Sequence, residues 1–199
     1  MNVLFATSEA RPYIASGGLA DVSGALPKAL CTAGVDCRVI LPLYSDIPQN
    51  LREEMTFLES FTVRLSWREL YCGLFTAKKD GVVYYFVDNE YYFRRSGIYG
   101  HYDDGERFAF FSMAVLESVR HMGEFAPDVL HCNDWQTGLV PVFLEVFFRR
   151  DPKFSRMKTV FTIHNIQYQG DFDMFVAGDV AGLPEDNAIL WSSAAAATT

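Results

Sequence analysis

The sequence predicts an α/β fold in which helices cover both faces of a parallel sheet and an antiparallel β-hairpin is inserted into it. Three observations support this prediction. Short apolar runs alternate with helical patterns in the first and last thirds of the chain. β-rich runs fill the middle, where Asp80-Gly81 is a strong hairpin signal. Polar segments directly follow three of the apolar runs, as is typical where parallel strands end.

The first elements form a predicted βαβ unit. Residues 2–7 are a short apolar strand, a helix follows that stops at Gly34, and a second strand covers 36–41 before Pro42. This order implies a parallel pair with a right-handed crossover. Pro27 lies inside the helix, which predicts a kink or a late helix start. The apolar stripe of the helix follows a period of 3.6 residues and consists of Val22, Ala25, Leu26, Ala29 and Leu30.

The middle of the chain is predicted to be the antiparallel insertion. The runs 61–67, 71–77 and 82–87 are short and rich in β-forming residues. The segment 89–105 that follows is polar, aromatic and contains glycine, so it is predicted to be a surface loop. Such loops carry function disproportionately.

The last third returns to alternating helices and strands. The helix that follows the loop is predicted to turn one face to the core, and 140–149 is predicted to be another helix. The segments 128–131 and 159–163 are predicted strands, the second of them buried. If all these strands are parallel, the glycine pair after 2–7, the segment 131–134 and His164-Asn165 gather at one edge of the sheet. The core face of the first of these helices comprises Phe108, Phe111, Val115, Leu116 and Val119.

Composition excludes several classes of protein. With 199 residues, 50% of them apolar, the chain is long enough for one globular domain with a sizeable core. The net charge of −8 argues against nucleic-acid binding, and no apolar run is long enough to span a membrane. The four scattered cysteines suggest neither a zinc site nor a disulfide framework, which favours reduced thiols in the cytosol. The start at Met1 runs straight into a strand, so no signal peptide is expected.

The most informative motif is Ser16-Gly17-Gly18, which links the first strand to the first helix. Glycines at this place let a ligand approach the backbone, and the free amides that open a helix favour anions such as phosphate. The glycines are adjacent, so the pattern is not the G-x-G-x-x-G of dinucleotide-binding proteins. The alternative is a tight strand-to-helix turn without a ligand.

Other candidate residues also have two interpretations. Asp134 precedes a helix and would serve as its N-cap, and Asp21 would favour the helix dipole from the first turn. His164 taken alone fits a structural histidine, and Arg107 fits a surface or ion-pair residue as well as a ligand contact. The chain contains neither a G-x-S-x-G nucleophile elbow nor a G-x-x-x-x-G-K-[ST] phosphate loop.

Four blocks, taken together, are more specific than any one of them. The first joins Ser8-Glu9 to S-G-G-L-A-D-V at 16–22 and G-A-L-P at 24–27, and the second is D-G-E-R-F at 104–108. The third is N-D-W-Q-T-G-L at 133–139, and the fourth is F-T-I-H-N-I-Q-Y-Q-G at 161–170. In this order, the chain resembles the family of bacterial glycogen synthases and plant starch synthases.

The resemblance implies that residues 1–190 are the Rossmann-like, acceptor-side N-terminal half of a retaining GT-B glucosyltransferase. Such enzymes transfer glucose from ADP-glucose to the non-reducing end of an α-1,4-glucan, act in the bacterial cytoplasm and need no metal or other cofactor. A C-terminal nucleotide-sugar domain, absent from this sequence, supplies most donor contacts, so the chain alone is expected to be inactive. Residues 191–199 are interpreted as a truncated or placeholder tail.

The resemblance also assigns roles to single residues. His164, Asp134 and Asn165 would line the catalytic pocket around the transferred glucose, with the His164 carbonyl near the reacting centre. Gly17 and Gly18 would offer amides to the donor, and Tyr92 would lie over the active site. The substrate-binding residues implied are Ser16, Gly17, Gly18, Asp21, Tyr92 and Gln169.

The chain departs from the family pattern in two places. Ala15 stands where the family usually has a lysine that would face the diphosphate, and Asn133 and Gln136 stand where histidines are common. Two alternatives therefore stay open beside the synthase: a non-catalytic α-glucan-binding module, and a GT-B enzyme that uses another nucleotide sugar.

Overall fold

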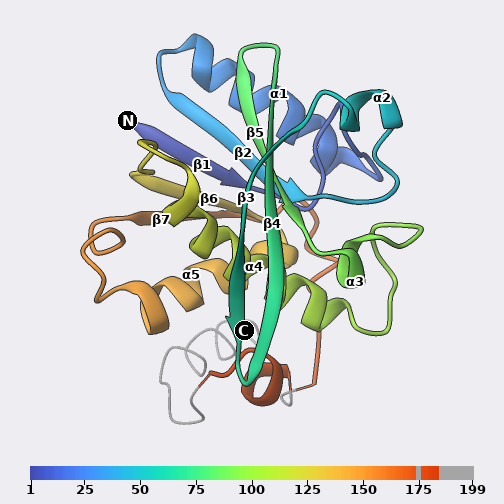
Figure 1. The fold of residues 1–199 in the computed structure, drawn as a ribbon, viewed down its shortest axis with the longest axis vertical. Coiled ribbons are helices and arrows are strands. Elements are labelled where there is room, and N and C mark those ends of the chain that lie inside the picture. Colours follow the sequence, from blue (N-terminus) through green and yellow to red (C-terminus); the bar gives the residue numbers. More distant parts are fainter. Residues whose placement is uncertain (174–175, 184–199) are drawn as a thin grey trace.

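A seven-stranded sheet forms the centre of the protein, which we describe from a computed structural model that defines residues 1–173 and 176–183. The strand order is β3-β4-β5-β2-β1-β6-β7. The strands β5, β2, β1, β6 and β7 are parallel, and β4 and β3 continue the sheet in antiparallel fashion (Figure 1). The strands are β1 (Asn2–Ala6), β2 (Asp36–Pro42), β3 (Thr56–Leu65), β4 (Arg68–Lys79), β5 (Val82–Asp88), β6 (Val129–Asn133) and β7 (Lys158–Thr162).

Helices cover both faces of this sheet. Helix α1 connects β1 to β2 on one face, whereas α4 and α5 lie on the other, as right-handed crossovers in opposite directions require (Figure 1). Short 3₁₀ turns lie at Val119–His121 and Trp135–Thr137, and π-helical turns at Leu144–Phe148 and Val176–Val180. The helices are α1 (Gly18–Thr32), α2 (Gln49–Arg52), α3 (Glu90–Phe93), α4 (Asp104–Ser118) and α5 (Leu139–Phe143).

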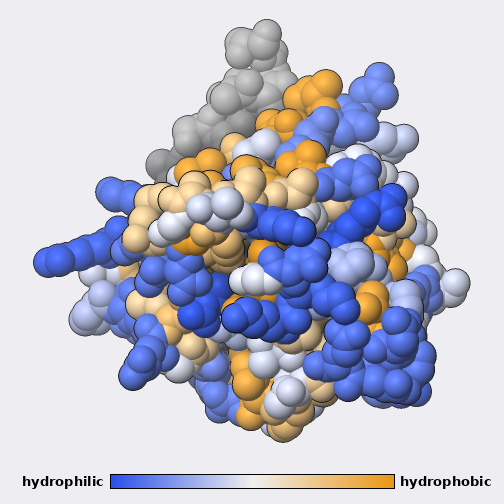
Figure 2. Space-filling view, turned by 90° about the horizontal axis from the view of Figure 1, so that it is seen from above, coloured by the Kyte–Doolittle hydropathy of each residue, from blue (hydrophilic) through white to orange (hydrophobic). Residues whose placement is uncertain are grey.

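The core is built on the central strands. In β1 the run Val3-Leu4-Phe5-Ala6 is buried on both faces, which explains why it is continuously apolar rather than alternating. Hydrophilic residues cover most of the outer face shown in Figure 2, with hydrophobic residues between them. No helix in the described part of the chain combines the length and apolar character needed to cross a membrane.

The side of α1 that was predicted to face the core is not the side that does so. Val22, Ala25 and Ala29 are exposed, while Leu26 and Leu30 are half-buried as expected. A set of mostly small residues packs against the sheet instead. The Ser23 hydroxyl bonds to Thr7 Oγ1 at 3.0 Å and so holds this side of the helix inward. Pro27 lies within the helix, which nevertheless begins at Gly18 and so does not start late. The buried set is Leu19, Ala20, Ser23 and Pro27.

Three further expectations need correction. The segment 89–105 is not simply a surface loop, since it contains α3 and buries Tyr92, Phe93 and Ile98. The buried face predicted for α4 was too narrow, because the helix lies between the sheet and the segments outside it and is buried on nearly all sides. Strand β7 is exposed rather than buried, because it is the edge strand with only β6 beside it.

The predicted antiparallel hairpin and its turn are both confirmed. Asp80 and Gly81 both have positive φ, 51° and 84°, as the two-residue turn between β4 and β5 requires. The pairing of β5 with β2 in parallel joins the hairpin to the parallel sheet, as the predicted fold class requires. The expected boundary at 190 and the tail 191–199 lie outside the described residues.

The positive φ at Gly81 predicts that two glycine-to-alanine variants differ in their free energy of unfolding. Gly81→Ala is expected to lower the free energy of unfolding by about 1 kcal/mol, because a Cβ is strained in the left-handed region. Gly18→Ala is the matched control: its φ is not positive and a Cβ there has no atom within 4 Å, so stability is expected to stay equal or rise slightly. Urea denaturation measures both, and equal losses would contradict the assignment of strain to Gly81.

Candidate active site

A cleft of about 1050 Å³ opens where β1, β6 and β7 end and α1 begins. This confirms the prediction that the glycine pair, the segment after β6 and His164-Asn165 meet at one edge of the sheet. Of the predicted site residues, seven line the cleft and two do not. The seven are Ser16, Gly17, Gly18, Asp134, His164, Asn165 and Gln169.

The glycine pair is not explained by the turn that contains it. Gly17 has an extended backbone (φ −157°), Gly18 has no positive φ, and a Cβ on either would meet nothing within 4 Å. Neither glycine is therefore required by conformation or by packing. In the described chain the amides of Gly18 and Leu19 have no hydrogen-bond partner. These facts favour a ligand over the tight-turn interpretation.

The amide of Gly17 is already used, by the carboxylate of Glu9. This buried side chain accepts hydrogen bonds from the Ser16 N–H, the Gly17 N–H (3.2 Å) and the Ser16 hydroxyl (3.0 Å). It also accepts one from Tyr99 Oη at 3.1 Å. Glu9 thus fixes the segment before α1, and the free amides of the helix begin at Gly18. The sequence motif contains Glu9, but the motif alone did not predict this role for it.

Tyr99, rather than Tyr92, lies over the cleft. Tyr92 is fully buried and donates its hydroxyl to Glu106, so its predicted place over the active site is wrong. The Tyr99 hydroxyl lies 2.7 Å from Ser8 Oγ as well as bonding to Glu9. Burial and the charge of Glu9 raise the pKa of Tyr99, which keeps the hydroxyl neutral and able to donate.

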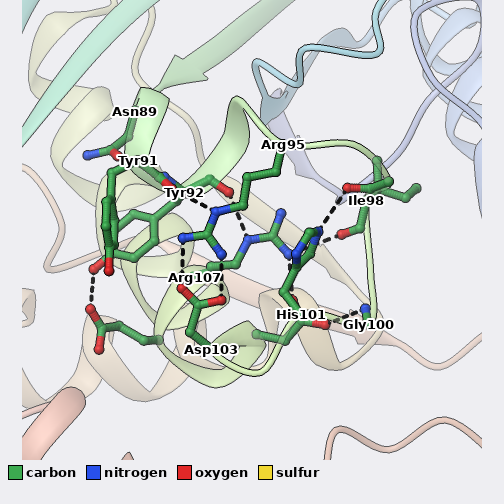
Figure 3. Close-up of polar contacts among 12 residues, drawn as sticks. Asn89, Tyr91, Tyr92, Arg95, Ile98, Gly100, His101, Asp103 and Arg107 are labelled. Carbon is green, nitrogen blue, oxygen red and sulfur yellow. Dashed lines mark hydrogen bonds and ion pairs between the residues drawn. The ribbon is translucent and has the colours of Figure 1, made fainter.

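Arg107 holds the loop that carries Tyr99 (Figure 3). Its fully buried guanidinium donates to the Tyr92 carbonyl through Nε at 2.8 Å and forms an ion pair with Asp104 at 2.5 Å. The other Asp104 oxygen accepts the Gly100 N–H at 2.8 Å. Of the two interpretations offered by the sequence, ion pair or ligand contact, the structure supports the ion pair. Arg107 does not line the cleft but positions the loop that does.

Asp134 connects the two strands that end at the cleft. Asp134 occupies the N-cap position of the turn that follows, but its φ is +57° and its side chain makes no cap hydrogen bond there, so capping does not account for the carboxylate. The carboxylate instead accepts the backbone N–H of His164 at 2.6 Å. Its own N–H donates to the Thr162 carbonyl at 2.9 Å. The end of β6 is thereby fixed to the segment after β7.

Two histidines bond to side chains at the ends of β6 and β7. The His164 ring bonds through Nε2 to Asn133 Oδ1 at 3.0 Å, and the His131 ring bonds to Thr162 Oγ1 at 2.8 Å. Burial, and then the proximity of His164, lower the pKa of His131, which favours its neutral form at pH 7. Only His164 of the two lines the cleft.

The remaining wall is formed by the segment after His164. Asn165 Oδ1 accepts the Gln167 N–H at 3.0 Å, and Gln169 Nε2 donates to the Ile166 carbonyl at 2.9 Å. Gly170 has φ +67°, and a Cβ there would lie 2.4 Å from the Trp135 ring, so only glycine allows this segment to pack on Trp135.

The cleft is acidic on the side that this chain provides. Its charged lining residues are Glu9, Asp104, Asp134 and Asp171, and no lysine or arginine lines it among the described residues. Ala15 is exposed at the position where the family usually has a lysine. Asp21 does not line the cleft but forms an exposed ion pair with Arg11.

Comparison with known proteins shows the family of this chain. A family model described as the starch synthase catalytic domain matches residues 2–195. The chain belongs to this family. It is 54% identical over 187 residues to a glycogen synthase of Clostridium novyi (strain NT) and 55% identical over 183 residues to one of Desulfitobacterium hafniense (strain DSM 10664 / DCB-2). These matches cover 94% and 92% of this chain but 39% of each relative.

The fold of this chain also matches a solved structure. The catalytic domain of starch synthase IV from Arabidopsis thaliana, bound to ADP and acarbose, superposes with a TM-score of 0.81 at 29% identity. The match covers 92% of this chain and 37% of that one. It confirms the predicted fold class, the α/β domain of a GT-B glycosyltransferase.

The buried ion pair predicts a large cost of removing its cation. Arg107→Met is expected to lower the free energy of unfolding by about 3 kcal/mol, because Asp104 would remain buried without its partner. Arg64→Met, which breaks the exposed pair with Glu69, is the matched control and is expected to cost less than about 1 kcal/mol. Similar denaturation midpoints for the two variants would show that Arg107 does not anchor the loop.

Proposed function

We propose that this chain is the acceptor-side half of a glycogen synthase that transfers glucose from ADP-glucose to the non-reducing end of an α-1,4-glucan with retention of configuration. The observation that carries the proposal is the start of α1, where the side-chain-free glycine pair and the free amides of Gly18 and Leu19 line one cleft with His164 and Asn165. The family supports the reaction class. ADP and acarbose in the Arabidopsis relative support the donor and the glucan chemistry.

The donor diphosphate is placed at the start of α1. The amides of Gly18 and Leu19 and the positive end of the helix stabilise the departing ADP, and the absence of side chains at 17 and 18 permits close approach. Among the residues that the structure describes, four carboxylates and no cation line this side. The cations that such a leaving group needs therefore come from the part of the protein beyond this chain, which spans 39% of its relatives.

The transferred glucose is placed against the opposite wall. Asp134 fixes the main chain of His164, so that the His164 carbonyl and the carboxylates of the cleft stabilise positive charge on the sugar. Asn165 and Gln169 supply hydrogen bonds to hydroxyl groups. Buried Gln136 Oε1 at the same wall has no partner among the described residues, which favours a ligand that brings a donor.

Closure of the second half over this cleft would exclude water and protect the donor from hydrolysis. We expect the chain alone to be inactive, because half of the donor site is missing. All four cysteines are free, which agrees with a cytoplasmic enzyme. The acidic cleft and Ala15 favour one alternative, a module that binds α-glucan without catalysis.

The test is a chimera that joins this chain to the remainder of the Clostridium novyi glycogen synthase. We expect it to extend a glucan from ADP-glucose, measured by incorporation of labelled glucose, and the chain alone to give none. Gly18→Val is expected to lower kcat/KM for ADP-glucose by about 100-fold, because the side chain displaces the diphosphate from the amides. Ala29→Val, on the exposed side of the same helix, is the matched control.

Each outcome separates the candidate functions. Glucan binding without transfer by a folded chimera would support the binding module. Transfer from another nucleotide sugar in preference to ADP-glucose would support the alternative donor. Equal kinetics for Gly18→Val and Ala29→Val would contradict the placement of the donor at the start of α1.

A further inference from the structure

The orientation of the Asn133 side chain is fixed by two carbonyl groups. This fully buried amide ends β6, and its Nδ2 donates to the Ala6 carbonyl at 3.0 Å and to the His131 carbonyl at 3.2 Å. The reverse orientation would place the amide oxygen against two carbonyl oxygens. Only one orientation therefore satisfies the amide, and in it Oδ1 faces His164.

This orientation determines which nitrogen of His164 carries a proton. An amide oxygen only accepts hydrogen bonds, and it lies 3.0 Å from His164 Nε2, so Nε2 must donate. In the neutral ring the other nitrogen, Nδ1, then carries a lone pair. Nδ1 has no hydrogen-bond partner in residues 1–173 and 176–183, and His164 lines the cleft.

The ring also has little freedom to escape this contact. The backbone N–H of His164 is held by Asp134 Oδ1 at 2.6 Å, so the main chain and the ring are each fixed from β6. His131 offers a contrast within the same site. Its Nε2 faces the Thr162 hydroxyl, which can either donate or accept, so that contact selects no tautomer.

We propose that Asn133 is a positioning residue that holds His164 in the Nε2–H tautomer and leaves Nδ1 as an acceptor for a substrate hydroxyl. The substrate hydroxyl rests on the proposed function, whereas the tautomer does not. A sugar hydroxyl that donates to Nδ1 keeps its own oxygen free to accept from other groups. A ring with Nδ1–H would instead make the same hydroxyl the acceptor, so the tautomer sets the direction of this hydrogen bond and thereby which other groups the hydroxyl can bind.

The tautomer is tested by NMR on the 199-residue chain with ¹⁵N-labelled histidine, at a pH where the rings are neutral. We expect His164 to be almost entirely the Nε2–H form. Asn133→Leu, which removes the acceptor, is expected to give a mixture with the Nδ1–H form. Asn133→Asp is expected to keep the Nε2–H form, because one carboxyl oxygen still accepts from His164 while the other, held protonated by the Ala6 and His131 carbonyls, replaces the amide donor.

Two results would overturn the inference: a wild-type His164 with its proton on Nδ1, or the same tautomer populations in Asn133→Leu as in the wild type. If Asn133→Leu does not fold, the wild-type and Asn133→Asp spectra still decide. In the chimera, Asn133→Leu is expected to lower kcat/KM about tenfold more than Asn133→Asp does. Because the tautomer is read without catalysis, an inactive chimera would count against the proposed function and not against the role of Asn133.

Discussion

The hydrogen bond from the His164 N–H to the Asp134 carboxylate is the interaction on which the cleft depends. A positive φ at Asp134 turns the carboxylate away from the following turn and toward the end of β7. That one contact fixes the main chain at His164 and the point where the segment with Asn165 and Gln169 begins, while Asn133 holds the His164 ring. Glu9 has the same function on the opposite wall, where it binds the segment that leads into α1. Each wall of the cleft is thus fixed by a carboxylate that accepts backbone amides.

These carboxylates explain why, in the proposed reaction, this chain binds the sugar while the diphosphate needs groups from elsewhere. A fixed acidic cleft suits a sugar that becomes positive during transfer, and hydroxyl groups that donate hydrogen bonds. It suits a diphosphate poorly, apart from the amides of Gly18 and Leu19. In the proposed function the cations therefore approach from outside this chain, and domain closure would couple donor binding to exclusion of water.

The sequence was sufficient to predict the parallel sheet, its crossovers and the edge at which the site lies, because apolar runs and their polar ends follow from simple periodicity. It was not sufficient for contacts between distant segments. The pairing of Tyr99 with Glu9, and the burial of Arg107 and Tyr92, depend on how 89–105 folds back onto α4. The phase of α1 was missed because a polar residue, Ser23, faces the sheet through a hydrogen bond to Thr7. One available clue to Tyr99 was its place between Gly97 and Gly100, both of which have positive φ.

The most direct test of this account is an NMR titration of the ¹⁵N-labelled chain with maltotriose and, separately, with ADP-glucose. The account predicts saturable shifts of cleft residues with maltotriose, centred on Asn165 and Gln169, and a much weaker response to ADP-glucose confined to the amides of Gly18 and Leu19. Tight binding of ADP-glucose by the chain alone would contradict the claim that the cations lie outside it. Cleft signals unmoved by both ligands would contradict the assignment of this cleft as a glucan and donor site.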